Sequence, residues 1–348
     1  MQERFNDRGH REQYVSGRHL KLDQLKVVVR GGNRYLSKEN IPDYPQPEFL
    51  ASHLKHDTDL QGLKGIREME GFRNPKCGSL LWWNLVVGPE EIETAERRLL
   101  ETTYPDQTKE QIQTQQRFLE QFATSQVFKS SSMFGSNRFT FPVKELLEAY
   151  REQFCSGAEL IMRVMETILY KQEVEYVVLV HSPANQEQYS QYPLLSDNQN
   201  PICSYEDGCF LWRSEAMCET HSFELVQSDA EKKMRAVGAG NYPQFYVWDN
   251  VAIALHVGDK VLKFDVNRLR ENLTFCERAT VTIVENALFQ DFTAAEKEVA
   301  KLWPGYPPLM KDGEIKKESP QEYQYTAEGL ETPSEYFCKK EEEEFKIE

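Results

Sequence analysis

Apolar positions recur at helical spacing in one part of the chain and at strand spacing in another. A helix is predicted from Pro89, where Ile92, Ala95 and Leu99 share one face. A second begins with a capping pattern at Thr108 and has Ile112, Leu119 and Phe122 near helical spacing. A third is predicted over 142–154 and ends before Gly157, which favours a helix stop.

After residue 160 the pattern changes to short segments rich in β-branched and aromatic residues. An antiparallel pair is predicted over 163–170 and 173–180, and a hairpin over 202–213, turning at Asp207-Gly208. Further predicted elements are a meander of strands 245–248, 251–257 and 261–264 that turns at Asp249-Asn250, a strand at 281–284 and a short helix at 294–302.

This order predicts an α+β fold in which a helical N-terminal half packs on a largely antiparallel sheet, with a disordered acidic tail. Residues 1–47 are polar and contain a Pro-spaced stretch, so they are expected to form a partly ordered lead-in. Residues 48–305 form the predicted single domain. Residues 306–348 are rich in Glu, Lys and Pro, and too poor in apolar residues to offset the entropy of ordering.

Charge and composition narrow the possible partners. The 348 residues carry 41 Lys plus Arg against 56 Asp plus Glu, a formal charge of −15, which makes a nucleic-acid partner unlikely. No apolar run approaches the roughly 20 residues of a membrane span, and the first residues lack a signal-peptide pattern. The seven cysteines contain no CxxC pair, which indicates reduced thiols. A cytoplasmic protein without membrane contact is therefore expected.

Common catalytic and nucleotide-binding motifs are absent from the sequence, including GxGxxG, GxxxxGK[ST], HExxH and GxSxG. The histidines are scattered, so no metal site is predicted. Residues 129–138 combine Lys129, serines, Gly135 and Arg138, as a phosphate-binding loop would. A flexible linker is the favoured interpretation of this segment, and Arg138 stays a candidate anion contact.

Two segments resemble the ADP-ribosyltransferase-like family of the diphtheria-toxin and poly(ADP-ribose) polymerase type. The first is Leu54-Lys55-His56-Asp57-Thr58 with Gly71-Phe72 beyond it, and the second begins Glu175-Tyr176. The resemblance implies NAD as cofactor, with His56 and Thr58 at the cleft, Trp82 stacked on nicotinamide and Glu175, beside Glu173, stabilising the oxocarbenium-like transition state. Whether such a domain is an active transferase on a protein acceptor stays open.

An alternative function is a non-enzymatic protein–protein interaction module. Asp57 stands where the family has Gly, and Trp82 stands where it has Tyr. In this interpretation the aromatic β-rich half, with Trp212, Tyr246 and Trp248, and the acidic tail contact a protein partner. The two hypotheses differ in whether His56, Trp82 and Glu175 meet in one cleft.

Overall fold

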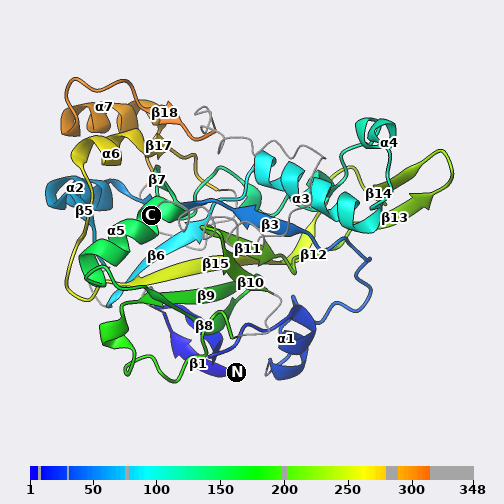
Figure 1. Cartoon of the computed structure of the whole chain (residues 1–348), viewed down its shortest axis with the longest axis horizontal. Coiled ribbons are helices and arrows are strands. Elements are labelled where there is room, and N and C mark those ends of the chain that lie inside the picture. Colours follow the sequence, from blue (N-terminus) through cyan, green and yellow to red (C-terminus); the bar gives the residue numbers. More distant parts are fainter. Residues whose placement is uncertain (7–8, 30, 75–77, 198–201, 280–288, 314–348) are drawn as a thin grey trace, which may run out of the picture. The chain divides into compact units, whose positions relative to one another are not determined.

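The computed structural model describes residues 1–6, 9–29, 31–74, 78–197, 202–279 and 289–313 (Figure 1). The helices are α1 (Leu22–Val28), α2 (Leu60–Met69), α3 (Pro89–Thr103), α4 (Lys109–Gln113), α5 (Val143–Phe154), α6 (Val266–Glu271) and α7 (Phe292–Leu302), with short 3-10 helices η1 (Leu119–Gln121), η2 (Gln126–Phe128) and η3 (Pro183–Asn185).

The strands follow in chain order. They are β1 (Gln2–Phe5), β2 (Arg11–Ser16), β3 (Glu48–Ala51), β4 (His53–Thr58), β5 (Gly71–Phe72), β6 (Leu80–Leu85), β7 (Asn137–Pro142), β8 (Ile161–Tyr170), β9 (Glu173–His181), β10 (Cys203–Glu206), β11 (Cys209–Arg213), β12 (Met217–Cys218), β13 (His221–Gln227), β14 (Lys232–Gly238), β15 (Phe245–His256), β16 (Leu262–Lys263), β17 (Leu273–Phe275) and β18 (Met310–Lys311).

The largest sheet among the described residues is mixed. Its strand order is β1-β2-β8-β9-β15-β6-β4-β7-β17-β18, and β12 pairs with β15 outside this path. The central pair β9 and β15 is parallel, as is the pair β17 and β18, whereas β8 with β9 and β15 with β6 are antiparallel. The long chain segment between β9 and β15 is what makes their parallel pairing possible.

The predicted fold class is therefore wrong. The N-terminal half is not a helical layer, because β4, β6 and β7 run through the main sheet and helices occur from α1 to α7. These three strands are six residues each, which is too short for the pattern of apolar and polar residues to distinguish a strand from a helix. Leu80–Leu85 is apolar at every position except Asn84, so its alternation of buried and half-buried side chains is hardly visible in the sequence. Pairing with neighbours stabilises such short segments as strands.

Several local predictions are confirmed. The helix beginning at Pro89 is α3, the third predicted helix is α5, and the final short helix is α7. The helix after Thr108 begins as predicted in α4, where Thr108 Oγ1 accepts from Gln111 N at 3.3 Å, but it ends at Gln113, and Leu119 lies in the separate 3-10 helix η1. The β8–β9 pair is antiparallel, and the β10–β11 hairpin turns at Asp207-Gly208, both with positive φ. The predicted strand at 281–284 lies outside the described residues.

The predicted meander at 245–264 is wrong, because Asp249 and Asn250 stay inside one continuous strand, β15. Asp249 is fully buried and pairs with Val174 of β9. Its carboxylate accepts from Ser214 Oγ at 3.1 Å and from Glu215 N at 2.9 Å. Tertiary hydrogen bonds thus hold in a strand two residues whose type favours turns.

The two faces of the main sheet are covered differently. The extensive core lies on the face of Trp83, Phe72 and Tyr150, where α5 packs. A smaller cluster on the other face joins Val177, Leu179 and Ala254 to Tyr189, with Trp82 packed against it. The chain after η3 therefore covers part of the second face.

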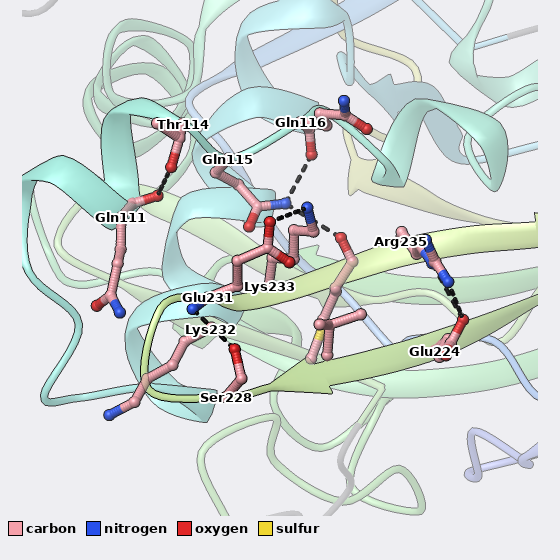
Figure 2. A network of polar contacts seen from close by, with 12 residues as sticks. Gln111, Thr114, Gln115, Gln116, Glu224, Ser228, Glu231, Lys232, Lys233 and Arg235 are labelled. Atoms are coloured by element: carbon pink, nitrogen blue, oxygen red, sulfur yellow. Dashed lines mark hydrogen bonds and ion pairs between the residues drawn. The ribbon is translucent and has the colours of Figure 1, made fainter.

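A separate two-stranded hairpin, β13–β14, lies beside α3 and α4 (Figure 1). Figure 2 shows Gln115 reaching this hairpin, where its Nε2 donates to Met234 O at 3.1 Å. Arg235 and Glu224 pair across the two strands at 2.8 Å. The charges drawn on this hairpin are therefore largely paired with one another.

Residues 1–312 form one compact unit. The lead-in contributes β1, β2 and α1, and β2 pairs with β8. At the other end β18 pairs with β17, and Asp312 N donates to Phe275 O at 2.8 Å. Residues 314–348, most of the predicted tail, lie outside the described residues.

Candidate functional site

His56 lies on β4 and faces the aromatic core. Its ring centroid is 5.3 Å from that of Phe72 and 5.4 Å from that of Trp83. Its Nδ1–H donates to the carbonyl oxygen of Trp82 at 2.9 Å. Burial lowers the pKa of His56 and outweighs that hydrogen bond, so the ring is held neutral. His56 acts here as a packed, hydrogen-bonded strand residue.

Trp82 and Glu175 lie on the opposite face of the sheet from His56. Trp82 precedes Trp83 on β6, so its side chain points away from the face that Trp83 shares with His56. Trp82 pairs with Ala254, which pairs with Leu179, and Glu175 lies four residues before Leu179 on the same strand face. That separation is about 13 Å along the strand. The structure therefore does not bring His56, Trp82 and Glu175 together.

Thr58 ends β4, where it pairs with Asn137 of β7. Its carbonyl oxygen accepts from Asn137 Nδ2 at 3.4 Å, and Gly135 packs directly against its backbone. A Cβ added to Gly135 would lie 2.2 Å from the carbonyl carbon of Thr58. Thr58 thus anchors the segment before β7.

Two of the three aromatic residues expected at a protein interface are in the interior. Trp212 is 2% exposed and packs between Phe49 and Phe128. Trp248 is 4% exposed, and only Tyr246 is half-buried. The two tryptophans are therefore not available to a macromolecular surface.

A cleft of about 960 Å³ opens between the start of β15, the segment around η2, and the ends of β17 and β18. Its size is at the upper end of the range for small-molecule sites. The lining residues are Thr124, Ser125, Gln126, Lys129, Ser130, Ser131, Gln172, Pro243, Gln244, Phe245, Trp248, Phe275, Glu277, Arg278, Lys311 and Asp312.

Three cationic side chains line this cleft. They are Lys129 before β7, Arg278 after β17, and Lys311 in β18. Glu277 lies 3.7 Å from Lys311 and partly offsets its charge. Within the described ranges, no carboxylate lies at ion-pair distance from Lys129 or Arg278. The lining is therefore locally cationic in a chain whose formal charge is −15.

The fifth charged lining residue, Asp312, is already paired. Arg138 Nη1 donates to Asp312 Oδ2 at 2.6 Å, and Arg138 also holds Asp57 through Nε at 2.7 Å and Nη2 at 2.8 Å. The Arg138 and Asp57 side chains are only 4% and 6% exposed. Arg138 thus links β4, β7 and the end of β18, and it is not free to bind an anion.

Arg138 also positions the lining segment of the cleft. Its Nη1 donates to Ser130 O at 2.8 Å. Burial would raise the pKa of Asp57, but the charge of Arg138 and its hydrogen bonds outweigh this and lower it. Burial, and then Arg138, lower the pKa of the nearby Lys55 to about 8. The ionised Asp57 and Arg138 therefore form a fixed support behind Lys129 and Ser130.

Two buried polar groups of the lining lack a hydrogen-bond partner among the described residues. One is the indole Nε1–H of Trp248, and the other is the Oγ of Ser125, a residue that is 7% exposed. Ser125 precedes η2 and makes no side-chain cap for it. Buried polar groups in proteins are nearly always satisfied, so two groups without a partner in one cleft lining call for an explanation.

The sequence indicated this site only in part. It singled out residues 129–138, but the preferred linker interpretation is wrong, since Ser132 and Ser136 are each 1% exposed and β7 begins at Asn137. Ser125, Arg278 and Lys311 carried no sequence signal, because they are brought together only by the pairing of β17 with β7 and β18.

Other types of site find no support within the described part of the chain. No cluster of three or more His, Cys, Asp or Glu side chains there is arranged to hold a metal ion. The helices described are all too short or too polar to cross a membrane. Comparison of the chain with family models, curated proteins and solved structures found no match.

Proposed function

We propose that this protein binds a small, phosphate-bearing anion in the cleft lined by Lys129, Arg278 and Lys311. The observation that carries the proposal is the convergence of these three cations on one cavity of about 960 Å³. Charge-assisted hydrogen bonds from Lys and Arg are the strong contacts to phosphate oxygens. The serine hydroxyls of residues 130 and 131 add neutral donors of the kind found in phosphate sites.

The electrostatic setting supports an anionic ligand over a cationic one. Asp312 shares Arg138 with Asp57, and the lining itself carries three cations against the two carboxylates of Glu277 and Asp312. A cleft with low-dielectric walls focuses the field of its charges, so two cations without ion-pair partners attract anions despite the acidic chain.

The NAD-dependent transferase expectation lacks this kind of support. It requires one pocket shared by His56, Trp82 and Glu175, and these residues lie on two faces of the sheet. The interaction-module expectation rests on Trp212, Tyr246, Trp248 and the acidic tail; the two tryptophans are buried, Tyr246 is half-buried, and most of the tail lies outside the described residues. The cleft is therefore the better basis for a functional proposal.

The test is a calorimetric titration with pyrophosphate. Wild-type protein is expected to bind it, and the double variant Lys129→Gln/Arg278→Gln to bind at least about tenfold more weakly, since each charged contact contributes about 1.5–3 kcal/mol. Binding should also weaken as NaCl rises.

A matched control carries the same loss of two charges away from the cleft, Lys26→Gln/Lys297→Gln, at exposed positions of α1 and α7. This control is expected to keep wild-type affinity. Equal weakening in both double variants would show that only the net charge of the protein matters, and this would contradict a site in the cleft. Absence of binding to the wild type would refute the proposal.

A further inference from the structure

We infer that the ligand of this cleft has a second end, a planar ring that carries a hydrogen-bond acceptor, so that the ligand class is a phosphorylated planar heterocycle. This inference rests on the proposed function. It adds a ligand group that would contact the uncharged part of the cleft lining. The observation behind it is that the Trp248 indole N–H and the Ser125 hydroxyl are buried and have no hydrogen-bond partner among the described residues.

The indole N–H of Trp248 is a donor only. Its residue is 4% exposed, and no acceptor among the described residues takes this hydrogen. An unsatisfied buried donor is costly, and a ligand that supplies an acceptor removes that cost. A ring nitrogen or a ring carbonyl meets this requirement, whereas a hydrocarbon does not.

The Ser125 hydroxyl is the second such group. It can donate or accept, so it suits a ring edge that presents mixed donors and acceptors. The amide side chains of Gln126, Gln172 and Gln244 line the same cleft and extend this polar character. Gln126 Nε2 is already committed to Ser131 Oγ at 2.6 Å.

Aromatic side chains give the cleft its apolar part. Phe245, Trp248 and Phe275 line it, and Phe245 is only half-buried. Aromatic side chains favour planar partners, by offset stacking or by edge contacts. A cleft with cations, aromatic side chains and buried neutral donors therefore fits a ring joined to a phosphate better than a phosphate alone.

The experiment compares five probes by calorimetry: pyrophosphate, ribose 5-phosphate, adenosine, adenosine monophosphate and flavin mononucleotide. Adenosine monophosphate or flavin mononucleotide is expected to bind at least tenfold more tightly than ribose 5-phosphate. Comparing these two probes shows whether the cleft prefers a purine ring or the larger flavin ring.

Two variants test the buried donors. Ser125→Ala and Trp248→Phe should each reduce the affinity for the ring-bearing phosphate about threefold to tenfold and leave ribose 5-phosphate binding unchanged. Ser125→Ala is the cleaner variant, because its Oγ has no partner in the free protein and its loss should not lower the melting temperature. It keeps the inference testable if Trp248→Phe is poorly folded.

The outcomes separate this inference from the proposed function. Ribose 5-phosphate binding as tightly as both ring-bearing phosphates, or a ring preference that survives both variants, would overturn the inference alone. Failure of every phosphate probe to bind, or binding of adenosine as tight as that of its monophosphate, would overturn the proposed function as well.

Discussion

Asp249 shows how strongly a single buried side chain responds to its surroundings. It lies in the middle of β15, fully buried, and its oxygens accept from Ser214 Oγ and Glu215 N. Burial raises its pKa to about 7, and the charge of Glu215 adds to this, while the two hydrogen bonds oppose it. Because the ordinary pKa is 3.8, the folded state holds a proton between about pH 4 and pH 7 that the unfolded state has lost.

This group therefore makes the protein less stable as pH rises through that window. Asp249→Asn removes this titration. The wild type should therefore lose about 2–3 kcal/mol of unfolding free energy relative to the variant between pH 5 and pH 8. Urea unfolding of both proteins at the two pH values measures the difference. A difference that does not change with pH would contradict this reading of Asp249.

Arg138 is a second residue whose role depends on burial. Arg138→Met removes the guanidinium that pairs with the buried Asp57 carboxylate, so the free energy of unfolding should fall by about 3–5 kcal/mol. The double variant Asp57→Asn/Arg138→Met should recover part of that loss. The exposed pair of Arg235 and Glu224 is the control, and Arg235→Met should cost less than about 1 kcal/mol. Equal costs in the two single variants would contradict the assigned role.

The helices and strands of the fold differ in how well the sequence predicts them. Helices α3 and α5 were predicted because their apolar faces repeat over several turns and their starts are marked. Strands β6 and β7 were not, because six residues give little periodicity and pairing partners decide their state. Of the cleft residues, Lys129 and its serines were indicated as a less favoured phosphate-binding loop, and Trp248 was indicated as an interface residue instead.

The segment before β7 offers a test at the scale of an element. Gly135 lies so close to Thr58 that a Cβ would meet its carbonyl oxygen at 2.2 Å, which forces the segment to shift. Gly135→Ala should therefore lower the melting temperature and also weaken binding in the cleft that Lys129 and Ser130 line.

A matched glycine lies in the middle of α2. A Cβ at Gly65 would meet only Met69 Cε, at 3.8 Å. Gly65→Ala should raise the stability of the protein by up to about 1 kcal/mol and leave binding unchanged. A stable Gly135→Ala variant with unaltered affinity would show that this segment does not position the cleft.

For the whole molecule, the formal charge of −15 gives no indication that the lining of the cleft is locally cationic. Lys129, Arg278 and Lys311 are far apart in the sequence, and strands β7, β17 and β18 bring them to one cavity. Composition could therefore weigh against a large polyanion as partner but could not indicate a small anion site. The same limit applies to the transferase hypothesis, whose three residues are in the expected chain order but not on one face.

The most direct measurement is an NMR titration of protein labelled with ¹⁵N in its five tryptophans. The Trp248 indole signal is identified by its loss in Trp248→Phe, and adenosine monophosphate or flavin mononucleotide is then added. The Trp248 N–H signal is expected to shift most, because this group gains the acceptor that it lacks in the free protein. Binding that leaves the Trp248 signal in place and shifts another tryptophan, or no shift at all, would contradict this expectation.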